Sequence, residues 1–342
     1  MTSVPGRSVV ESTLVSSGGG VESGAHPIAP GVTRGERGPS RHRTPLRPAR
    51  PNALASPAAS RATLTIMSGP DAGRMIALDD EVTVIGRDAG RGAPIEDSSV
   101  SRRHACIARG SDGCFTIEDL GSTNGTLVQG VRVARARLEP GSYVQLGASF
   151  LLRFALVDAT DEEMRRRLYE TSIHDPLTRV YNRRYFYGRL DAEVASARRT
   201  GDPLALIMVD VDEFKRFNDR FGHLPGDRAL CFIAAQVARL VGSDSVLARY
   251  GGEEFVALAP GSTHADAMRV AERIRRGIDA IAFSVAGNSV NLSVSIGVAS
   301  LSEVSELAEF ATGGQGAALV GLADERLYAA KRAGRNVVCG GG

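Results

Sequence analysis

Two aspartates stand where a strongly hydrophobic β-type run ends. The run is Leu204–Val211, and it is closed by Asp210 and Asp212 on either side of Val211. Carboxylates at the end of a strand can hold Mg²⁺ together with substrate phosphates, because this hard cation requires oxygen ligands. The same aspartates could instead pair with nearby arginines, so this segment alone leaves both interpretations open.

A second acidic pair follows two adjacent glycines. Gly251 and Gly252 separate two short β-type runs and predict a hairpin with a type I′ turn. A plain hairpin does not explain Glu253 and Glu254, the carboxylates directly after the glycines. Because glycines let a large ligand approach the backbone closely, a ligand-binding hairpin is the functional interpretation.

Two cations near the C-terminus complete this set. Lys331 and Arg335 are four residues apart, and we expect both on the last turn of a helix, where cations are favourable. The functional alternative is a two-cation clamp on a triphosphate. Of the 41 Lys and Arg residues, the only lysines are Lys215 and Lys331, both in candidate phosphate-contacting segments. Lysine and arginine are not interchangeable, so this usage favours function.

A second group of polar residues lies nearer the N-terminus. A phosphate binds a fixed guanidinium, a hydroxyl and amide donors in one concavity, and Arg87, Ser101, Arg102 and Asn124 offer that set. Singly, each could be a turn residue or a surface arginine. His104 is predicted to be a structural histidine that braces the loops.

Two kinds of domain must position these groups. Short β-type runs divided by turns over residues 62–156 predict an all-β sandwich. Alternating helix and strand patterns over residues 173–340 predict an α/β domain with a largely antiparallel sheet. The patterns place its strands at 204–211, 247–250, 255–258, 291–299 and 336–339, and its helices at 226–241, 265–281 and 318–333.

Two connecting segments flank the sandwich. Residues 1–61 are rich in Gly, Ser, Pro and Arg without apolar periodicity, which predicts a disordered arm. Residues 157–172 predict a charged linker helix, with acids early and arginines later. The helix could be a rigid connector or simply a solvated linker.

Composition limits the possible partners. The net charge of +2 is too small to indicate nucleic acid or a membrane. Four cysteines without a C-x-x-C pair favour a reducing compartment. No run reaches about 18 apolar residues, and the N-terminus is a poor signal peptide. We therefore expect a soluble, cytoplasmic protein.

Five ordered motifs in the second domain resemble the GGDEF family of diguanylate cyclases. They read DPLTRVYNRRYF, DVDEFKRFNDRFGHLPGD, RYGGEEF, SVSIGVA and ADERLYAAKRAGRN. The resemblance implies a central, mostly antiparallel sheet flanked by helices, as in nucleotidyl cyclases and polymerase palms. It implies that two GTP molecules, one on each protomer of a homodimer, condense to cyclic di-GMP with release of two pyrophosphates.

The resemblance also assigns roles to residues. Asp210, Glu253 and the carbonyl of Val211 would ligate Mg²⁺, with Mn²⁺ as a substitute, and Glu254 would assist the metal or the 3′-hydroxyl. The GTP-binding residues would be Phe214, Lys215, Asn218, Asp227, Lys331 and Arg335. Of these, Asn218 and Asp227 would contact guanine; an ionised carboxylate suits its paired N–H donors and should reject adenine.

The sequence departs from the family at the product-inhibition motif R-x-x-D. Gly242 and Ser245 occupy the positions expected for the arginine and the aspartate. Since bidentate capture of a phosphate or guanine needs the arginine, we expect weak or absent feedback by this route.

The polar set of the first domain resembles the forkhead-associated (FHA) domain, whose pattern is G-R, S-x-x-H and N-G. The resemblance implies that Arg87 and Ser101 hold the phosphate of a phosphothreonine, and that Arg102 and Asn124 contact the peptide backbone or assist. The peptide could come from a Ser/Thr kinase, from another protein, or from the chain's own arm at Thr13, Thr33 or Thr44. Whether this domain binds a peptide stays open at this point.

Two other classes of function compete with the enzyme. One is a non-catalytic sensor that binds GTP or a partner, for which loss of Asp210, Glu253 or Lys331 would be typical; all three are present. The other is a phosphopeptide adaptor whose cyclase domain only dimerises. Magnesium-dependent pyrophosphate release from GTP separates the enzyme from both.

Overall fold

The computed structural model describes residues 60–90, 92–95, 97, 99–285, 287–305 and 314–341. Nearly all of the predicted arm, with Thr13, Thr33 and Thr44, lies outside the described residues. Within the described part, no helix combines the length and apolar composition needed to cross a bilayer.

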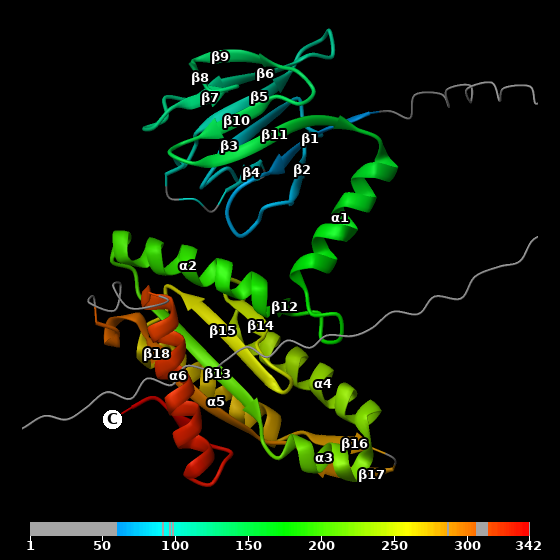
Figure 1. Ribbon diagram of the computed structural model, residues 1–342, viewed down its shortest axis with the longest axis vertical. Helices are drawn as coiled ribbons and strands as arrows, with labels where there is room; N and C mark the ends of the chain where they lie inside the picture. Colours follow the sequence, from blue (N-terminus) through cyan, green and yellow to red (C-terminus); the bar gives the residue numbers. More distant parts are fainter. Residues whose placement is uncertain are drawn as a thin grey trace, which may run out of the picture. The chain divides into compact units, whose positions relative to one another are not determined.

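The first domain is a sandwich of two β-sheets (Figure 1). One sheet has the order β2-β1-β11-β10-β7-β8 and the other β4-β3-β5-β6-β9. Alternate residues of β11, such as Leu152 and Phe154, are buried, because successive side chains of a strand point to opposite faces. The predicted all-β sandwich is confirmed. Its strands are β1 (Arg61–Ile66), β2 (Met75–Ala77), β3 (Val82–Gly86), β4 (Ala93–Pro94), β5 (Ala105–Arg109), β6 (Phe115–Asp119), β7 (Thr126–Val128), β8 (Val131–Val133), β9 (Arg135–Leu138), β10 (Tyr143–Leu146) and β11 (Phe150–Val157).

A charged helix, α1 (Ala159–Ile173), follows β11. The side chain of Asp158 caps it by accepting hydrogen bonds from the N–H groups of Thr160 and Asp161. No residue of α1 is buried. The predicted helix is therefore present, although its arginines lie mid-helix beside Glu163 and Glu170 rather than in the last turn.

The second domain contains a sheet with the strand order β12-β14-β15-β13-β18-β19. The central pairs β14–β15, β15–β13 and β13–β18 are antiparallel, and the two outer pairs are parallel. The predicted mostly antiparallel sheet is thus confirmed. The strands are β12 (Tyr181–Asn182), β13 (Leu204–Val211), β14 (Val246–Arg249), β15 (Glu254–Pro260), β18 (Val294–Ser300) and β19 (Val338–Cys339).

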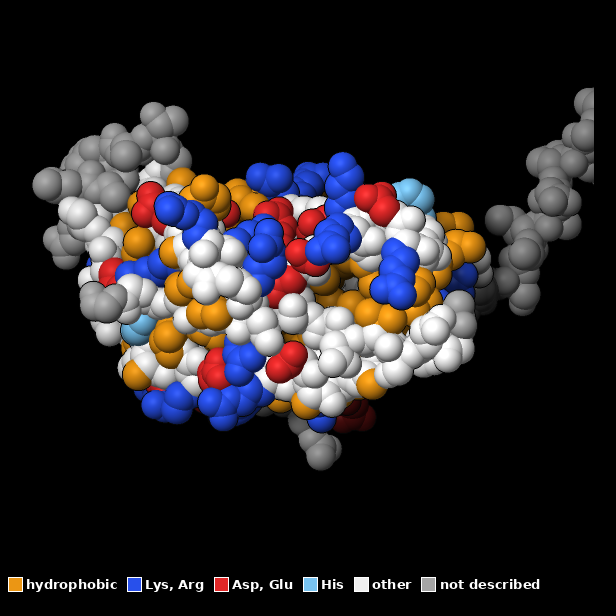
Figure 2. All heavy atoms as spheres, turned by 90° about the horizontal axis from the view of Figure 1, so that it is seen from below, with side chains coloured by type: hydrophobic (Ala, Val, Ile, Leu, Met, Phe, Trp, Pro, Cys, Tyr) orange, Lys and Arg blue, Asp and Glu red, His pale blue; other side chains and the backbone are white. Residues whose placement is uncertain are grey.

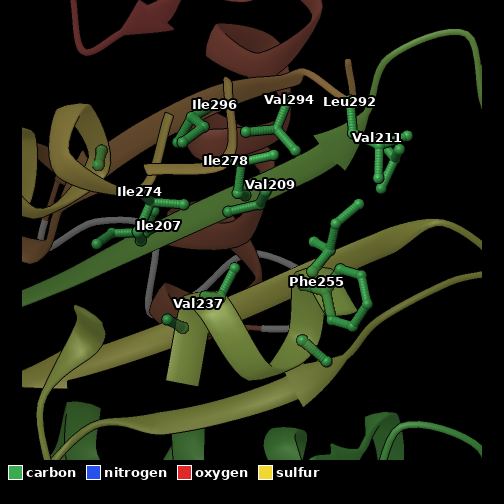
Figure 3. Close-up of a cluster of buried hydrophobic side chains, with 14 of the residues drawn as sticks. Ile207, Val209, Val211, Val237, Phe255, Ile274, Ile278, Leu292, Val294 and Ile296 are labelled. Atoms are coloured by element: carbon green, nitrogen blue, oxygen red, sulfur yellow. The ribbon is translucent and has the colours of Figure 1, made fainter. Parts of the chain in front are cut away.

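Helices cover both faces of this sheet (Figure 1). Odd-numbered residues of β13 pack with α4 (His223–Val241), α5 (His264–Asp279) and the phenylalanines of α3 (Phe214–Phe221), as Figure 3 shows in part. Even-numbered residues pack with α2 (Arg183–Thr200) and α6 (Gly314–Arg332). Because both faces are covered, every residue of β13 is buried, and its end is rigidly placed.

Three local expectations need correction. The predicted strand 291–299 is broken: β17 (Asn288–Asn291) pairs with β16 (Ala282–Val285) in a separate hairpin, and β18 begins at Val294. The segment after β13, for which no element was predicted, contains the helix α3. Helix α2 fills a stretch for which the sequence analysis placed no element.

Candidate active site

Three motifs meet at the carboxylate of Asp210. This residue closes β13 between β15 and β18, and its side chain is almost fully buried. The ammonium of Lys331 lies 2.8 Å from Asp210 Oδ2. Burial raises the pKa of Asp210 to about 6; the hydrogen bond and charge of Lys331 oppose this rise, and Glu253 and Glu254 add to it. Asp210 is therefore close enough to both glutamates to be affected by their charges.

Those glutamates lie where the loop after β14 enters β15: Glu253 ends the loop and Glu254 begins the strand. Glu254 is the register partner of Asp210, and the N–H of Val211 donates to the carbonyl of Glu253 (3.3 Å). The predicted type I′ turn is wrong, because neither glycine of the loop has a positive φ. The pairing of Arg249 with Phe255 leaves a longer loop, so the backbone does not need the inverted conformation of a two-residue turn.

Arg249 fastens this loop, although the sequence analysis gave it no role. Its guanidinium donates to the carbonyl of Gly252 (2.6 Å from Nη2) and to the carboxylate of Asp175 (3.2 Å from Nη1). Both residues lie inside motifs that suggested the family, DPLTRVYNRRYF and RYGGEEF. Opposite charges in two such motifs were the signal that could have paired them.

Lys331 and Arg335 do not share a helical turn. Helix α6 ends at Arg332, and Arg335 follows in a left-handed conformation with φ 63°. The expectation that both lie on the last turn is wrong for Arg335, because Gly334, at φ 117°, ends the helix as glycine commonly does. Lys331 lies at Asp210, whereas Arg335 is exposed.

Asn218 and Asp227 come from neighbouring helices, α3 and α4. A Cβ added to Gly226 would lie 1.9 Å from Asn218 Oδ1, so the amide of Asn218 packs directly against the start of α4, next to Asp227. This oxygen is buried and, within the described residues, has no hydrogen-bond donor. A buried unpaired acceptor is costly, so this position suits a ligand that brings an N–H group.

The other predicted phosphate contacts lie at the first turn of α3. The ring of Phe214 is buried and stacked with Phe217, so only its backbone can face a phosphate. Lys215 is exposed. Backbone N–H groups in the first turn of a helix have no partners within the helix and favour anions.

The oxygen donors near Asp210 fit Mg²⁺. They are the carboxylates of Asp210 and Glu253 and the carbonyl of Val211, on adjacent segments. Mg²⁺ commonly takes one or two carboxylates and completes its six ligands with water and substrate phosphates. The described residues contain no group of three or more His, Cys, Asp or Glu side chains arranged to hold a metal.

The polar residues of the sandwich gather on adjoining loops. The N–H of Arg87 donates to the carbonyl of Ser101 (3.1 Å), and its Nε donates to Val100. Ser101 Oγ accepts from the N–H of Thr123 (3.1 Å), while the Asn124 amide donates to the carbonyl of Ser99 (2.8 Å). A Cβ at Gly86 would lie 2.3 Å from the carbonyl oxygen of Arg102, so glycine is required for this approach.

His104 has the structural role predicted for it. It is fully buried, its Nδ1 accepts from the N–H of Ser101 (3.1 Å), and its Nε2 lies 3.1 Å from the carbonyl of Gly125. The histidine thereby joins the Ser101 and Asn124 loops.

Comparison with known proteins identifies two domain families in this chain. Residues 172–337 match the family model for the GGDEF domain of diguanylate cyclases, and residues 83–147 match that for the FHA domain. Response regulator PleD of Caulobacter vibrioides is 42% identical over 176 residues, which are 50% of this chain and 36% of PleD. Diguanylate cyclase DgcP of Pseudomonas aeruginosa is 38% identical over 49% of this chain and 24% of DgcP. The chain thus spans well under half the length of either protein.

A solved GGDEF domain is matched over most of its length. This domain of DgcB from Caulobacter crescentus, in complex with c-di-GMP, is 31% identical; the match covers 49% of this chain and 93% of the solved domain, with a TM-score of 0.45. By the match to the family model, residues 172–337 are a GGDEF domain of the diguanylate cyclase family. In this GGDEF domain, the segment at the family's product-inhibition position is the turn after α4. Gly242, at φ 94°, and Ser243 are exposed there, and Ser245 Oγ donates to the carbonyl of Val241.

Proposed function

We propose that this chain condenses two molecules of GTP into cyclic di-GMP and releases two pyrophosphates. The observation that carries this proposal is the convergence at Asp210. The end of β13, the loop with Glu253 and Glu254, and Lys331 of α6 meet at one buried carboxylate. A site built from two carboxylates and a lysine at the edge of a sheet suits phosphoryl chemistry on a metal–nucleotide complex.

The helices α3 and α4 would select guanine. The buried Asn218 oxygen is an acceptor in need of a donor, and Asp227 adds an acceptor-only carboxylate beside it. Guanine presents adjacent N–H donors on its ring edge, whereas adenine presents an acceptor at the corresponding ring nitrogen. ATP should therefore be a poor substrate, because it would leave these acceptors unpaired.

The reaction joins two half-sites. Asp210, Glu253 and the Val211 carbonyl would hold Mg²⁺, or Mn²⁺ in its place, which neutralises phosphate charge and activates the attacking hydroxyl. Lys215, Lys331, Arg335 and the first turn of α3 would bind the phosphates. The 3′-oxygen of one GTP forms a bond to the α-phosphorus of the other, pyrophosphate leaves, and Glu254 assists as the hydroxyl proton departs. A second, reciprocal transfer closes the ring.

This chemistry requires a homodimer, because each domain would hold one GTP. Helix α1 offers a surface for it: Met164 and Leu168 are 58% and 62% exposed and four residues apart, on one face of the helix. Pairing of two such helices would remove these side chains from water and bring two GGDEF domains together.

The FHA domain would regulate this encounter by binding phosphothreonine. Arg87 and Ser101 lie on adjoining loops and would hold the phosphate, with Arg102 and Asn124 on the peptide. If phosphopeptide binding changes dimerisation, an Arg87→Ala variant should lose the response to the relevant kinase. An unchanged response in that variant would contradict the regulatory role but not the cyclase.

The enzyme is tested by incubating the purified protein with GTP and Mg²⁺ and measuring cyclic di-GMP and pyrophosphate. The parent and an Asp202→Ala control, altered at an exposed loop aspartate, should make product, and Asp210→Ala should make none. GTP binding without product under dimeric conditions would favour a nucleotide sensor. The FHA site is tested separately, by titrating a phosphothreonine peptide into the parent and Arg87→Ala; only the parent should bind.

A further inference from the structure

Asp212, the second aspartate of the Asp-Val-Asp segment, has no role in the reaction described above. Its carboxylate nevertheless joins three segments of the chain. Oδ1 accepts from the hydroxyl of Ser295 (2.6 Å), and Oδ2 accepts from the hydroxyl of Ser293 (2.7 Å) and from the backbone N–H of Asn336 (3.0 Å). Asp212 thus connects the end of β13, the start of β18 and the loop after α6.

The loop after α6 has an unfavourable backbone. Gly334, Arg335 and Asn336 all have positive φ angles, of 117°, 63° and 49°. For a non-glycine residue, this region of backbone conformation is unfavourable, although asparagine tolerates it better than arginine. Contacts elsewhere must therefore hold the loop in place.

Hydrogen bonds to neighbouring segments supply that hold, and one of them runs from the N–H of Ile296 in β18 to the carbonyl of Val337 (2.9 Å). The N–H of Arg335 donates to the carbonyl of Ala330 (3.2 Å), and Arg275 donates to the side chain of Asn336 (2.9 Å). The hydrogen bond from the N–H of Asn336 to Asp212 is the link to β13. The guanidinium of Arg335 has no hydrogen bond or ion pair to any described residue, so its position depends on the backbone.

We propose that Asp212 is a positioning residue for the triphosphate of GTP. By accepting the Asn336 N–H, it fixes the left-handed loop and so places the Arg335 guanidinium for the phosphates. This inference rests on the proposed function, which assigns Arg335 to the phosphates. Asp212, Arg335 and Asn336 line one hollow of about 750 Å³ with α3 and the end of β17. Figure 2 shows that face, where basic and acidic side chains surround a hollow with hydrophobic side chains.

The positioning role of Asp212 and the electrostatic effect of its charge should change triphosphate binding in opposite directions. A carboxylate near a triphosphate repels it, so removing the negative charge should by itself strengthen triphosphate binding. If Asp212→Ala weakens that binding instead, the loss must come from the position of the loop. Asp212→Asn should restore most of it, because an amide oxygen can still accept the Asn336 N–H.

The experiment measures binding by calorimetry, with Mg²⁺ present, for two ligands. One is a GTP analogue with a methylene bridge between the α- and β-phosphates, which cannot release pyrophosphate, and the other is GMP. We expect Asp212→Ala to weaken the analogue roughly tenfold, the equivalent of one hydrogen bond, and to leave GMP within about twofold. Asp219→Ala, at an exposed aspartate of the same hollow, is the matched control and should weaken the binding of neither ligand.

A double-mutant cycle with Arg335→Ala decides whether Asp212 acts through that arginine. In the Arg335→Ala background, Asp212→Ala should cost nothing further. Additive losses, equal losses for GMP and the analogue, or tighter analogue binding in Asp212→Ala would each overturn the proposal.

Two safeguards keep the test decisive. If Asp212→Ala does not fold, the double variant Ser293→Ala/Ser295→Ala removes the two serine hydroxyls that orient the carboxylate. This variant should show the same selective loss of analogue binding on a smaller scale. A parent that binds neither ligand would overturn the proposed function together with this inference. A parent that binds both, with unchanged variants, would overturn only the role of Asp212.

Discussion

The amide of Asn218 is the group on which we expect nucleotide choice to depend. Its Oδ1 is buried without a donor among the described residues, and it lies against Gly226 rather than free in a cleft. Glycine at 226 is therefore a requirement of the site, since any side chain there must displace the amide.

We expect Gly226→Ala to raise the KM for GTP by roughly tenfold or more, the equivalent of one misplaced hydrogen bond. The added methyl would lie 1.9 Å from Asn218 Oδ1 and push the amide out of place. Steady-state kinetics with GTP measure the change. Gly321→Ala is the control: it is exposed on α6 with nothing within 4 Å of the new Cβ, so GTP kinetics should not change, and stability should rise by about 1 kcal/mol. An unchanged KM in Gly226→Ala would contradict the role given to Asn218.

At this scale, the sequence predicts residue types better than their surroundings. The motifs placed Asp210 and Lys331 in one candidate site, but they did not predict the salt bridge that joins the two side chains. The contacts of Asp212 could not be expected, because they join segments far apart in the chain. Only tertiary packing brings such partners together.

The loop between β14 and β15 is the element whose stiffness should matter most for turnover. Arg249 reaches back to the carbonyl of Gly252, one residue before Glu253, and to Asp175 at the start of the domain. Arg249 therefore restrains the loop directly before Glu253, the candidate metal ligand.

We expect Arg249→Lys to lower kcat by roughly tenfold with little change in KM for GTP, because an ammonium cannot make the forked contacts of a guanidinium. Stopped or continuous pyrophosphate assays measure this, and circular dichroism checks the fold. Arg239→Lys is the matched control, since the exposed side chain of Arg239 donates a hydrogen bond to Gln236 of the same helix, α4. A rise in the KM for GTP with an unchanged kcat would indicate that Arg249 serves nucleotide binding instead.

Hydrophobic periodicity identified the helices and strands whose side chains are buried at regular intervals. Strand 204–211 was predicted to the residue because both its faces are covered. Helix α3 was missed because its eight residues are too few for a clear helical periodicity. The strand at 291–299 was predicted as one because nothing in its alternation signals the break after Asn291, where the chain passes from a hairpin to the main sheet.

For the whole molecule, activity should follow the concentration of dimer. We expect Leu168→Glu to weaken self-association and to lower specific activity at low protein concentration, with recovery as concentration rises. Two charged side chains would meet where exposed leucines now offer apolar surface. Light scattering and initial rates over the same dilution series measure both. Arg166→Gln, on the opposite face of α1, loses only surface ion pairs and should match the parent.

At the scale of the whole molecule, we also expect this chain to lack inhibition by its product. Where the family has R-x-x-D, Gly242 and Ser245 provide no guanidinium to hold a phosphate or guanine of cyclic di-GMP. The conformation of the turn also disfavours an arginine at position 242. Gly242 has φ 94° and ψ 159°, a region nearly closed to other residues. We expect initial rates to stay constant as cyclic di-GMP is added up to low micromolar concentrations. Gly242→Arg/Ser245→Asp should not gain strong inhibition, because an arginine at 242 must first distort the turn. Clear inhibition of the parent over that range would mean that another surface of the molecule binds the product.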